Sequence, residues 1–228
     1  MLATAISKIQ GSPISAIFDQ ATRLRAEGRD LIDFSVGEPD FDTPEHICEA
    51  GTKAIRDGIT RYTPVDGTAA LKDAIARKFI TDNALEFSHS EIVVNTGAKS
   101  LLATALQAVI NPDDEVVIST PAWPSHIGMV EVCNGKPVII PATHEGGFKL
   151  GATALEAAIT PKTRMLLLCS PSNPTGAVYS AQELAKLADV LRRHPNVLVI
   201  SDDLYEHIIF DDNLFATLAA VAPGLRDR

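Results

Sequence analysis

The stretch RMLLLCSPSNPTGAVYSAQELAKLADVLRRHPNVLVISD, residues 164–202, holds two short apolar segments on either side of an amphipathic pattern. The segments from Arg164 to Cys169 and from Val197 to Ser201 each predict a strand that is buried on both faces. The apolar spacing from Ala181 to Arg193 predicts the helix that connects them. A strand, a helix and a strand in this order predict a parallel sheet covered by helices.

The same alternation continues toward the N-terminus. Further strands are predicted at 91–95, 115–119 and 137–140, and further helices at 98–110 and 125–132. Upstream of these, the pattern predicts helices at 14–27, 44–58 and 69–80, a short strand from Leu31 to Ser35, and a loop at 36–43. The sequence therefore predicts an α/β protein with a mostly parallel sheet and helices on both faces.

The composition limits the partners and the compartment. The chain has 228 residues, 46% of them hydrophobic, and a formal net charge of -9, which is typical of an ordinary globular protein. It has no Lys/Arg cluster that would indicate nucleic-acid binding, and no apolar run of membrane-spanning length. Cys48, Cys133 and Cys169 are far apart, which is typical of reduced thiols. We expect a cytoplasmic protein without a nucleic-acid or membrane partner.

Parallel sheets bind ligands beyond the carboxyl ends of their strands. The loop after Asn95, NTGAKS, leads from a strand into a helix, where backbone N–H groups can bind an anion such as phosphate. The alternative is a tight turn without a ligand. After the next strand, Trp123 lies between prolines and can stack on a flat aromatic ligand. The alternative for this side chain is simple packing.

Two more strand ends carry polar side chains. Asn173 lies between two prolines that fix the direction of its amide, although Asn-Pro is also an ordinary turn pair. Asp202 directly follows an apolar strand, and a carboxylate there needs a partner such as a cationic ring nitrogen. Tyr205 can direct its hydroxyl to the same ligand. The alternative is that Asp202 caps the next element.

Six motifs together resemble the class I aminotransferases, which are fold-type-I enzymes dependent on pyridoxal 5'-phosphate (PLP), and in particular the aspartate-aminotransferase-like members. In order, they are VGEPDFDTP (36–44), RYTPVDG (61–67), NTGAKS (95–100), PAWPS (121–125), SPSNPTG (170–176) and SDDLY (201–205). The resemblance begins near residue 10 and continues to the end of the chain. It implies an N-terminal arm with part of the small domain at 1–43, and an incomplete PLP-binding large domain at 44–228.

The resemblance also implies how the cofactor is bound. Gly97, Ala98 and Lys99 correspond to the segment that binds the cofactor phosphate. Trp123 corresponds to the aromatic residue that stacks on the pyridine ring. Asp202 corresponds to the carboxylate that pairs with the ring nitrogen.

Four further residues have implied roles. Asn173 and Tyr205 correspond to the pair that hydrogen-bonds the ring hydroxyl oxygen. Tyr62 corresponds to a tyrosine that reaches the cofactor phosphate of a neighbouring subunit, which implies a homodimer. Gly37 corresponds to a backbone contact near the substrate carboxylate.

The expected activity is transfer of an amino group between an amino acid and a 2-oxo acid. Lys99 resembles a lysine that in some relatives also meets a side-chain carboxylate, which favours aspartate as the amino acid. Asp203 departs from the family, which commonly has Glu there. The family's Schiff-base lysine follows SDDLY, whereas no lysine follows Lys186 here, so we expect no catalytic residue in this chain and no activity of the chain alone.

Three alternatives remain. One is another PLP chemistry on the same scaffold, such as a β-lyase or a decarboxylase. Another is a non-catalytic truncated remnant, which the absent lysine favours. The third is the PLP-binding half of a transcription regulator, which is disfavoured because no basic helix-turn-helix segment precedes the motifs.

Overall fold

A computed structural model describes residues 13–35 and 37–228. The chain divides into two compact units, with Gln10–Thr68 in one and Ala69–Arg228 in the other, and each is described by itself. Residues 1–12 of the predicted arm and Val36 of the VGEPDFDTP motif lie outside the described residues. The division between residues 43 and 44 stays a prediction.

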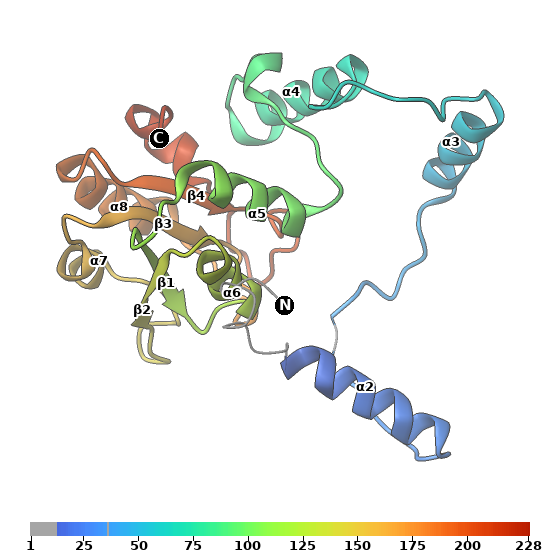
Figure 1. The fold of residues 1–228 in the computed structure, drawn as a ribbon, viewed down its shortest axis with the longest axis horizontal. Coiled ribbons are helices and arrows are strands. Elements are labelled where there is room, and N and C mark those ends of the chain that lie inside the picture. Colours follow the sequence, from blue (N-terminus) through green and yellow to red (C-terminus); the bar gives the residue numbers. More distant parts are fainter. Residues whose placement is uncertain (1–12, 36) are drawn as a thin grey trace. The chain divides into compact units, whose positions relative to one another are not determined.

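The larger unit is built on a four-stranded sheet in which every neighbouring pair is parallel (Figure 1). Its strands are β1 (Glu115–Thr120), β2 (Lys136–Pro141), β3 (Thr163–Cys169) and β4 (Leu198–Asp202), in the spatial order β2-β1-β3-β4. The predicted parallel sheet is therefore confirmed. The carboxyl ends of all four strands lie at the same edge of the sheet, and the sequence predicted the site at such an edge.

Helices connect and flank these strands. In the larger unit they are α4 (Ala69–Asn83), α5 (Ala98–Val109), α6 (Pro124–Val132), α7 (Ala152–Ala158), α8 (Ala181–Arg193) and α9 (Leu218–Val221), with 3-10 turns η1 (His89–Glu91) and η2 (Pro223–Leu225). The smaller unit contains α2 (Pro13–Ala26) and α3 (Glu45–Arg56). The predicted helices are confirmed to within a few residues, whereas α7 and α9 were not predicted.

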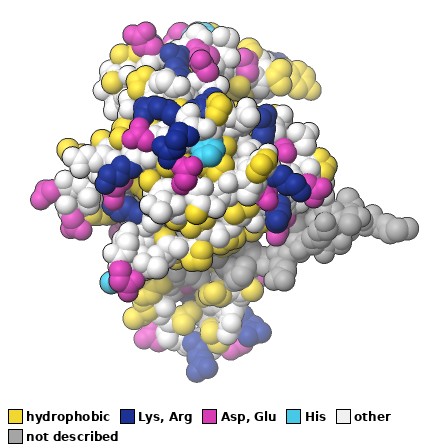
Figure 2. All heavy atoms as spheres, turned by 90° about the vertical axis from the view of Figure 1, so that its left-hand side faces the viewer, with side chains coloured by type: hydrophobic (Ala, Val, Ile, Leu, Met, Phe, Trp, Pro, Cys, Tyr) yellow, Lys and Arg dark blue, Asp and Glu magenta, His cyan; other side chains and the backbone are white. Residues whose placement is uncertain are grey.

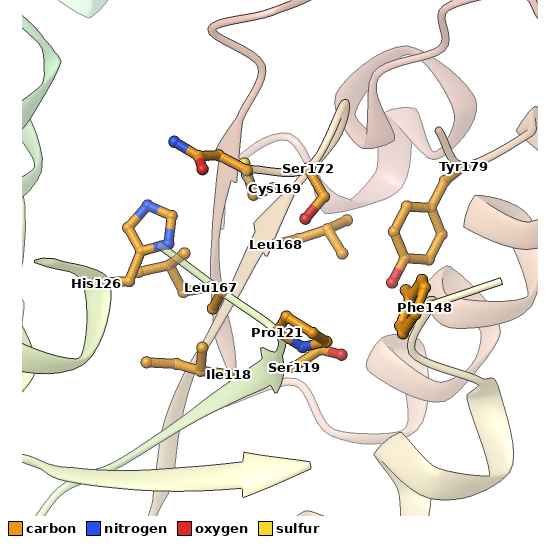
Figure 3. Close-up of a pocket in the computed structure, with 12 residues that line it drawn as sticks. Ile118, Ser119, Pro121, His126, Phe148, Leu167, Leu168, Cys169, Ser172 and Tyr179 are labelled. Atoms are coloured by element: carbon orange, nitrogen blue, oxygen red, sulfur yellow. The ribbon is translucent and has the colours of Figure 1, made fainter. Parts of the chain in front are cut away.

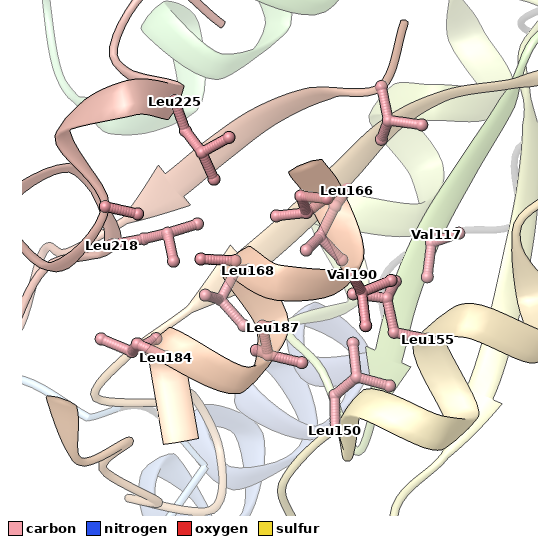
Figure 4. Packing of buried hydrophobic residues seen from close by; sticks show 14 of the residues in the cluster. Val117, Leu150, Leu155, Leu166, Leu168, Leu184, Leu187, Val190, Leu218 and Leu225 are labelled. Carbon is pink, nitrogen blue, oxygen red and sulfur yellow. The ribbon is translucent and has the colours of Figure 1, made fainter. Parts of the chain in front are cut away.

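Two hydrophobic clusters cover the two faces of the sheet. On one face, β1 and β3 pack against α5 and α6, with Leu106 and Val130 fully buried. On the other face, the alternate strand residues Val117, Leu166 and Leu168 pack against α7, α8 and α9 (Figure 4). The alternation explains why continuous apolar segments form these strands, since successive side chains point to opposite faces.

Two predicted strands are wrong. Residues 31–35 form no strand, and Ile32 and Phe34 are 82% and 91% exposed. In the segment 91–95, Glu91 ends η1 and residues 92–95 join no ladder. A strand needs a hydrogen-bonded neighbour, and none of the strands in the described residues pairs with either segment.

The surface carries mixed charges. Figure 2 shows basic and acidic side chains interspersed on one face, without a large region of one sign. Ion pairs such as Lys149–Glu183, 2.9 Å apart, are typical of this arrangement. None of the helices in residues 13–35 and 37–228 has the length and apolar character needed to cross a bilayer.

Candidate cofactor-binding site

Polar side chains gather where β1, β3 and β4 end. The chain leaves β1 and reaches Trp123, the residue before α6, whose first position is Pro124. β3 ends at Cys169, which lies opposite Asp202, the last residue of β4. Because these strands are parallel, their following loops lie at one edge of the sheet.

Asp202 pairs with a buried histidine. Its Oδ2 lies 2.9 Å from Nε2 of His126, and the two side chains are only 11% and 2% exposed. His126 belongs to the first turn of α6, and residues of α6 pack in the same cluster as β3 and β4. The histidine therefore reaches Asp202 across β3, and a shielded pair of this kind fixes the orientation of the carboxylate.

Asn173 and Tyr205 also meet. The Asn173 amide Nδ2 donates to the Tyr205 hydroxyl at 3.3 Å. The loop that carries Asn173 is fastened to β4, because the Ser170 N–H donates to the Asp202 carbonyl at 3.1 Å. The buried Ser170 hydroxyl in turn accepts from the Tyr179 N–H at 3.1 Å. An amide and a phenol hydroxyl are thus held together beside the end of β4.

The segment before α5 has the features of an anion site. Gly97 precedes the helix with φ +87° and ψ 157°, and no side chain caps the first turn of α5. Lys99 lies in that turn, and its Nζ is 5.0 Å from the centre of the Trp123 ring. The Trp123 ring meets the His126 ring edge-on, with centres 5.2 Å apart. Trp123 and His126 thus connect the α5 N-terminus to Asp202.

A small pocket adjoins these residues (Figure 3). It is lined by His126, Asn173, Cys169 and Tyr179 among others, and its volume of about 20 Å³ suits one water molecule rather than a cofactor. Burial, followed by the charge of Asp202, raises the pKa of the Cys169 thiol to about 12. This cysteine is therefore a protonated thiol at neutral pH and not a nucleophile.

The structure brings together most of the predicted site residues. Lys99, Trp123, Asn173, Asp202 and Tyr205 belong to one unit and are linked by the contacts above. Gly97 and Ala98, directly before Lys99, belong to the same unit. The other two candidates, Gly37 and Tyr62, belong to the Gln10–Thr68 unit, and the roles of all nine residues stay predictions. In that unit the Tyr62 side chain is fully exposed, and Gly37 lies in an exposed loop.

His126 was not predicted, although the sequence contains a signal for it. A histidine in the first turn of a helix that begins at a strand end is near the carboxyl edge of the sheet. The motif PAWPS ends at Ser125, one residue before His126, so the motif does not include the histidine.

These residue types fit a phosphorylated pyridine. A carboxylate suits a protonated ring nitrogen, and a paired amide and phenol suit a ring hydroxyl oxygen. An indole ring offers a flat stacking face. An uncapped helix N-terminus with a lysine in its first turn suits a phosphate.

The fold is that of the PLP-dependent aspartate aminotransferases. The structure is similar to aspartate aminotransferase from Rhizobium meliloti, with a TM-score of 0.95 and 49% identity over 99% of this chain and 56% of that one. It is also similar to the Thermus thermophilus aspartate aminotransferase with maleate, with a TM-score of 0.94 and 36% identity over 99% of this chain and 58% of that one. The chain belongs to the family described as aminotransferase class I and II, whose profile matches residues 29–227. Members of this family use PLP.

Curated relatives show the same similarity along the sequence. Aspartate aminotransferase of Rhizobium meliloti is 49% identical over 99% of this chain and 55% of its own length. Aspartate/prephenate aminotransferase of Cereibacter sphaeroides is 48% identical over 100% of this chain and 57% of its own length. The chain therefore spans about half the length of the curated relatives that it matches.

Proposed function

We propose that this chain is the PLP-binding part of an aminotransferase that moves an amino group between an amino acid and a 2-oxo acid. The observation that carries the proposal is the buried Asp202–His126 pair next to the Asn173–Tyr205 pair. A capping role alone accounts poorly for Asp202. The Leu204 N–H group lies 3.4 Å from Oδ1 of Asp202, which is long for a capping hydrogen bond. The other carboxylate oxygen, Oδ2, faces the buried His126.

PLP supplies an electron sink when bound, and a protonated ring nitrogen makes the sink stronger. The Asp202 carboxylate would hold the proton at that nitrogen, and His126 would keep the carboxylate in place. Asn173 and Tyr205 would donate to the ring hydroxyl oxygen. Trp123 would cover one face of the ring and exclude water from it.

Different residues are candidates for binding the cofactor phosphate and the substrate carboxylates. The N–H groups of Ala98 and Lys99, with Gly97 before them, would bind the cofactor phosphate. Lys99 would also meet a side-chain carboxylate, which supports aspartate as the amino donor. Gly37 would contact the substrate carboxylate, and Tyr62 would reach the phosphate of a second subunit in a homodimer.

The first test concerns how the cofactor is held. Where the 228-residue chain is obtained in soluble form, we expect it to bind PLP weakly and noncovalently, because SDDLY is followed by no lysine in this sequence. Exhaustive dialysis should then remove the cofactor, and borohydride should leave no pyridoxyl group on the chain. A pyridoxyl group found by peptide mapping on one lysine within residues 1–228 would contradict this expectation.

The second test concerns Asp202 in the protein expressed from its complete gene. Asp202→Ala should lower the rate of amino transfer from aspartate by about 10²–10³-fold, since it removes an electrostatic partner of the reacting group. Cofactor retention should change much less, because the phosphate site remains. Asp189→Ala is the matched control, since Asp189 forms an exposed pair with Arg192 on α8.

Turnover of Asp202→Ala within a few-fold of the parent would refute the role of Asp202. The same assay separates the chemical alternatives. An aminotransferase needs a 2-oxo acid as acceptor, whereas a β-lyase or a decarboxylase releases its product without one.

A further inference from the structure

Helix α4 is joined to the loop after β4 by one carboxylate. Lys78 Nζ contacts Oε1 of Glu206, and Asn83 Nδ2 donates to Oε2 of Glu206 at 2.8 Å. Lys78 also donates to the Asn83 amide oxygen at 2.7 Å. Each oxygen of Glu206 therefore has its own donor, and the two donors are linked to each other.

This cluster is shielded from water. The Glu206 and Lys78 side chains are 15% and 32% exposed, and Asn83 is buried. Burial alone would raise the pKa of Glu206, but the hydrogen bonds from Asn83 and Lys78 outweigh it and lower the pKa. Glu206 is thus a charged, fully paired group, and such a group resists displacement more than an exposed surface ion pair does.

Glu206 directly follows the residue whose hydroxyl meets Asn173. The backbone folds tightly here, because the Glu206 N–H donates to the Asp203 carbonyl at 3.0 Å and the Ile208 N–H donates to the Tyr205 carbonyl at 2.8 Å. In this turn, displacement of the Glu206 side chain moves Tyr205 as well. Leu204, on the other side of Tyr205, is exposed and offers no comparable anchor.

We propose that Glu206, held by Lys78 and Asn83 of α4, is a positioning residue that keeps the Tyr205 hydroxyl beside Asn173 for the ring hydroxyl of the cofactor. The proposal rests on the proposed function, because it assumes that Tyr205 contacts that ring. The proposal gives α4 a role in the site, although Lys78, Asn83 and Glu206 lie outside the six motifs. Lys78 and Asn83 lie far from Glu206 in the sequence and meet it only in the fold.

The experiment uses the protein expressed from its complete gene and pyridoxamine 5'-phosphate as the probe. This probe has no aldehyde, so its dissociation constant reports noncovalent contacts only. Glu206→Gln places an amide NH₂ against a donor, and Lys78→Met removes the cation from the opposite side. Each variant should bind the probe about five-fold more weakly by equilibrium dialysis, the effect of one impaired hydrogen bond.

A matched control and a double-variant cycle separate positioning from a general loss of structure. Lys186→Met, at an exposed position of α8, should bind the probe as the parent does. In a Tyr205→Phe background, Glu206→Gln should have no further effect. A probe that lacks the ring hydroxyl should bind the parent and Glu206→Gln equally.

Two results would overturn the proposal while leaving the proposed function intact. One is that Tyr205→Phe weakens binding while Glu206→Gln and Lys78→Met bind like the parent. The other is that Glu206→Gln weakens binding in a way that does not depend on the contact with the ring hydroxyl. The loss would then be equal in the parent and Tyr205→Phe backgrounds, or equal for pyridoxamine 5'-phosphate and for the probe that lacks the ring hydroxyl. If the parent itself fails to bind the probe, the proposed function fails, and this inference fails with it.

Discussion

At the scale of single residues, the contact between His126 and Asp202 is the most constrained feature of the candidate site. The Asp202 carboxylate ends a half-buried strand, and its side chain is only 11% exposed, so it loses hydration and depends on its remaining donors. His126 supplies the short contact at 2.9 Å, while the Leu204 N–H lies at 3.4 Å. The histidine therefore matters both for stability and for the direction in which Asp202 points.

We predict that His126→Phe lowers the free energy of unfolding of the complete protein by about 1–3 kcal/mol, because Asp202 loses its donor in a shielded place. Phenylalanine keeps a ring next to Trp123, so the change tests the hydrogen bond more than the packing. Urea unfolding measures the effect, and dialysis measures the accompanying loss of PLP.

The control is His194→Phe. His194 pairs with Glu156 at 2.8 Å, but both side chains are partly exposed, so the cost should stay below about 1 kcal/mol. Equal costs for the two variants would show that the shielding of Asp202 has no energetic importance.

The cysteines give a prediction about pH. Burial raises the pKa of Cys133, and it raises the pKa of Cys169 to about 12, whereas Cys48 is exposed. Since the thiolate is the reactive form, a raised pKa keeps the protonated, unreactive thiol up to higher pH. At pH 8, iodoacetamide should label Cys48 first and Cys169 last, as followed by peptide mapping. In urea all three should react, and rapid labelling of Cys169 in the folded protein would contradict the assignment.

At the scale of elements, Gly97 decides how α5 begins. Its φ of +87° with ψ of 157° lies in a region that is nearly closed to other residues, although a Cβ would meet no atom within 4 Å. Glycine is therefore required at position 97 by the backbone dihedral angles and not by a lack of space for a side chain.

We predict that Gly97→Ala costs about 1–3 kcal/mol of stability or turns the first N–H groups of α5 away from the phosphate. Gly151→Ala is a close control. Gly151 precedes α7, also has open space around its Cα, and has an ordinary φ of -84°. Calorimetry and phosphate-dependent cofactor binding should separate the two variants, and similar behaviour would contradict the backbone argument.

The sequence predicted the elements whose own residues show a clear apolar pattern, either a continuous apolar segment or apolar residues at helical spacing. The apolar segments of β3 and β4 and the amphipathic α8 are examples, because the helix buries Leu184 and Leu187 at helical spacing. The short helix α7, ATALEAA, was not predicted because four of its seven residues are alanine and a single leucine sets no apolar period.

Features that depend on a distant partner were not predicted. Residues 91–95 have a strand-like composition, but no described strand pairs with them. In the candidate site, the motifs indicated Asp202, Asn173 and Tyr205. The partners His126 and Lys78 were missed, because such contacts depend on where the chain folds back.

At the scale of the whole molecule, the described residues leave one strand at the edge of the sheet and several large apolar side chains exposed. β4 pairs with β3 on one side, and on its other side no strand of the described residues joins it, although the Val199 N–H donates to the Arg228 carbonyl at 2.8 Å. In the smaller unit, Gln10–Thr68, many large apolar side chains are not covered by residues of that unit, among them Ile32, Phe34, Phe41, Ile55, Ile59, Tyr62 and Val65. Edge strands and apolar patches of this kind favour association with other chains.

We predict that residues 1–228 alone are aggregated or loosely packed. They should gain native structure when a second polypeptide, corresponding to the part of the relatives that this chain does not cover, is added as a separate fragment. Each uncovered Val or Leu forfeits roughly 1.5–3 kcal/mol, against a total stability of about 5–15 kcal/mol for a domain. Size-exclusion chromatography and calorimetry test this with and without the fragment. A monodisperse chain with a sharp unfolding transition and no fragment would contradict it.

The position of Trp123 has a practical consequence. It is the only tryptophan in the chain, and it lies between Lys99 at the start of α5 and the ring of His126. Indole emission from residues 1–228 therefore comes from one place, the centre of the candidate site. Excitation at the red edge of the protein absorbance, where tyrosine contributes little, should make its fluorescence a built-in optical probe. A ligand that stacks on the ring should quench this signal, whereas a ligand bound elsewhere on the chain should leave it unchanged.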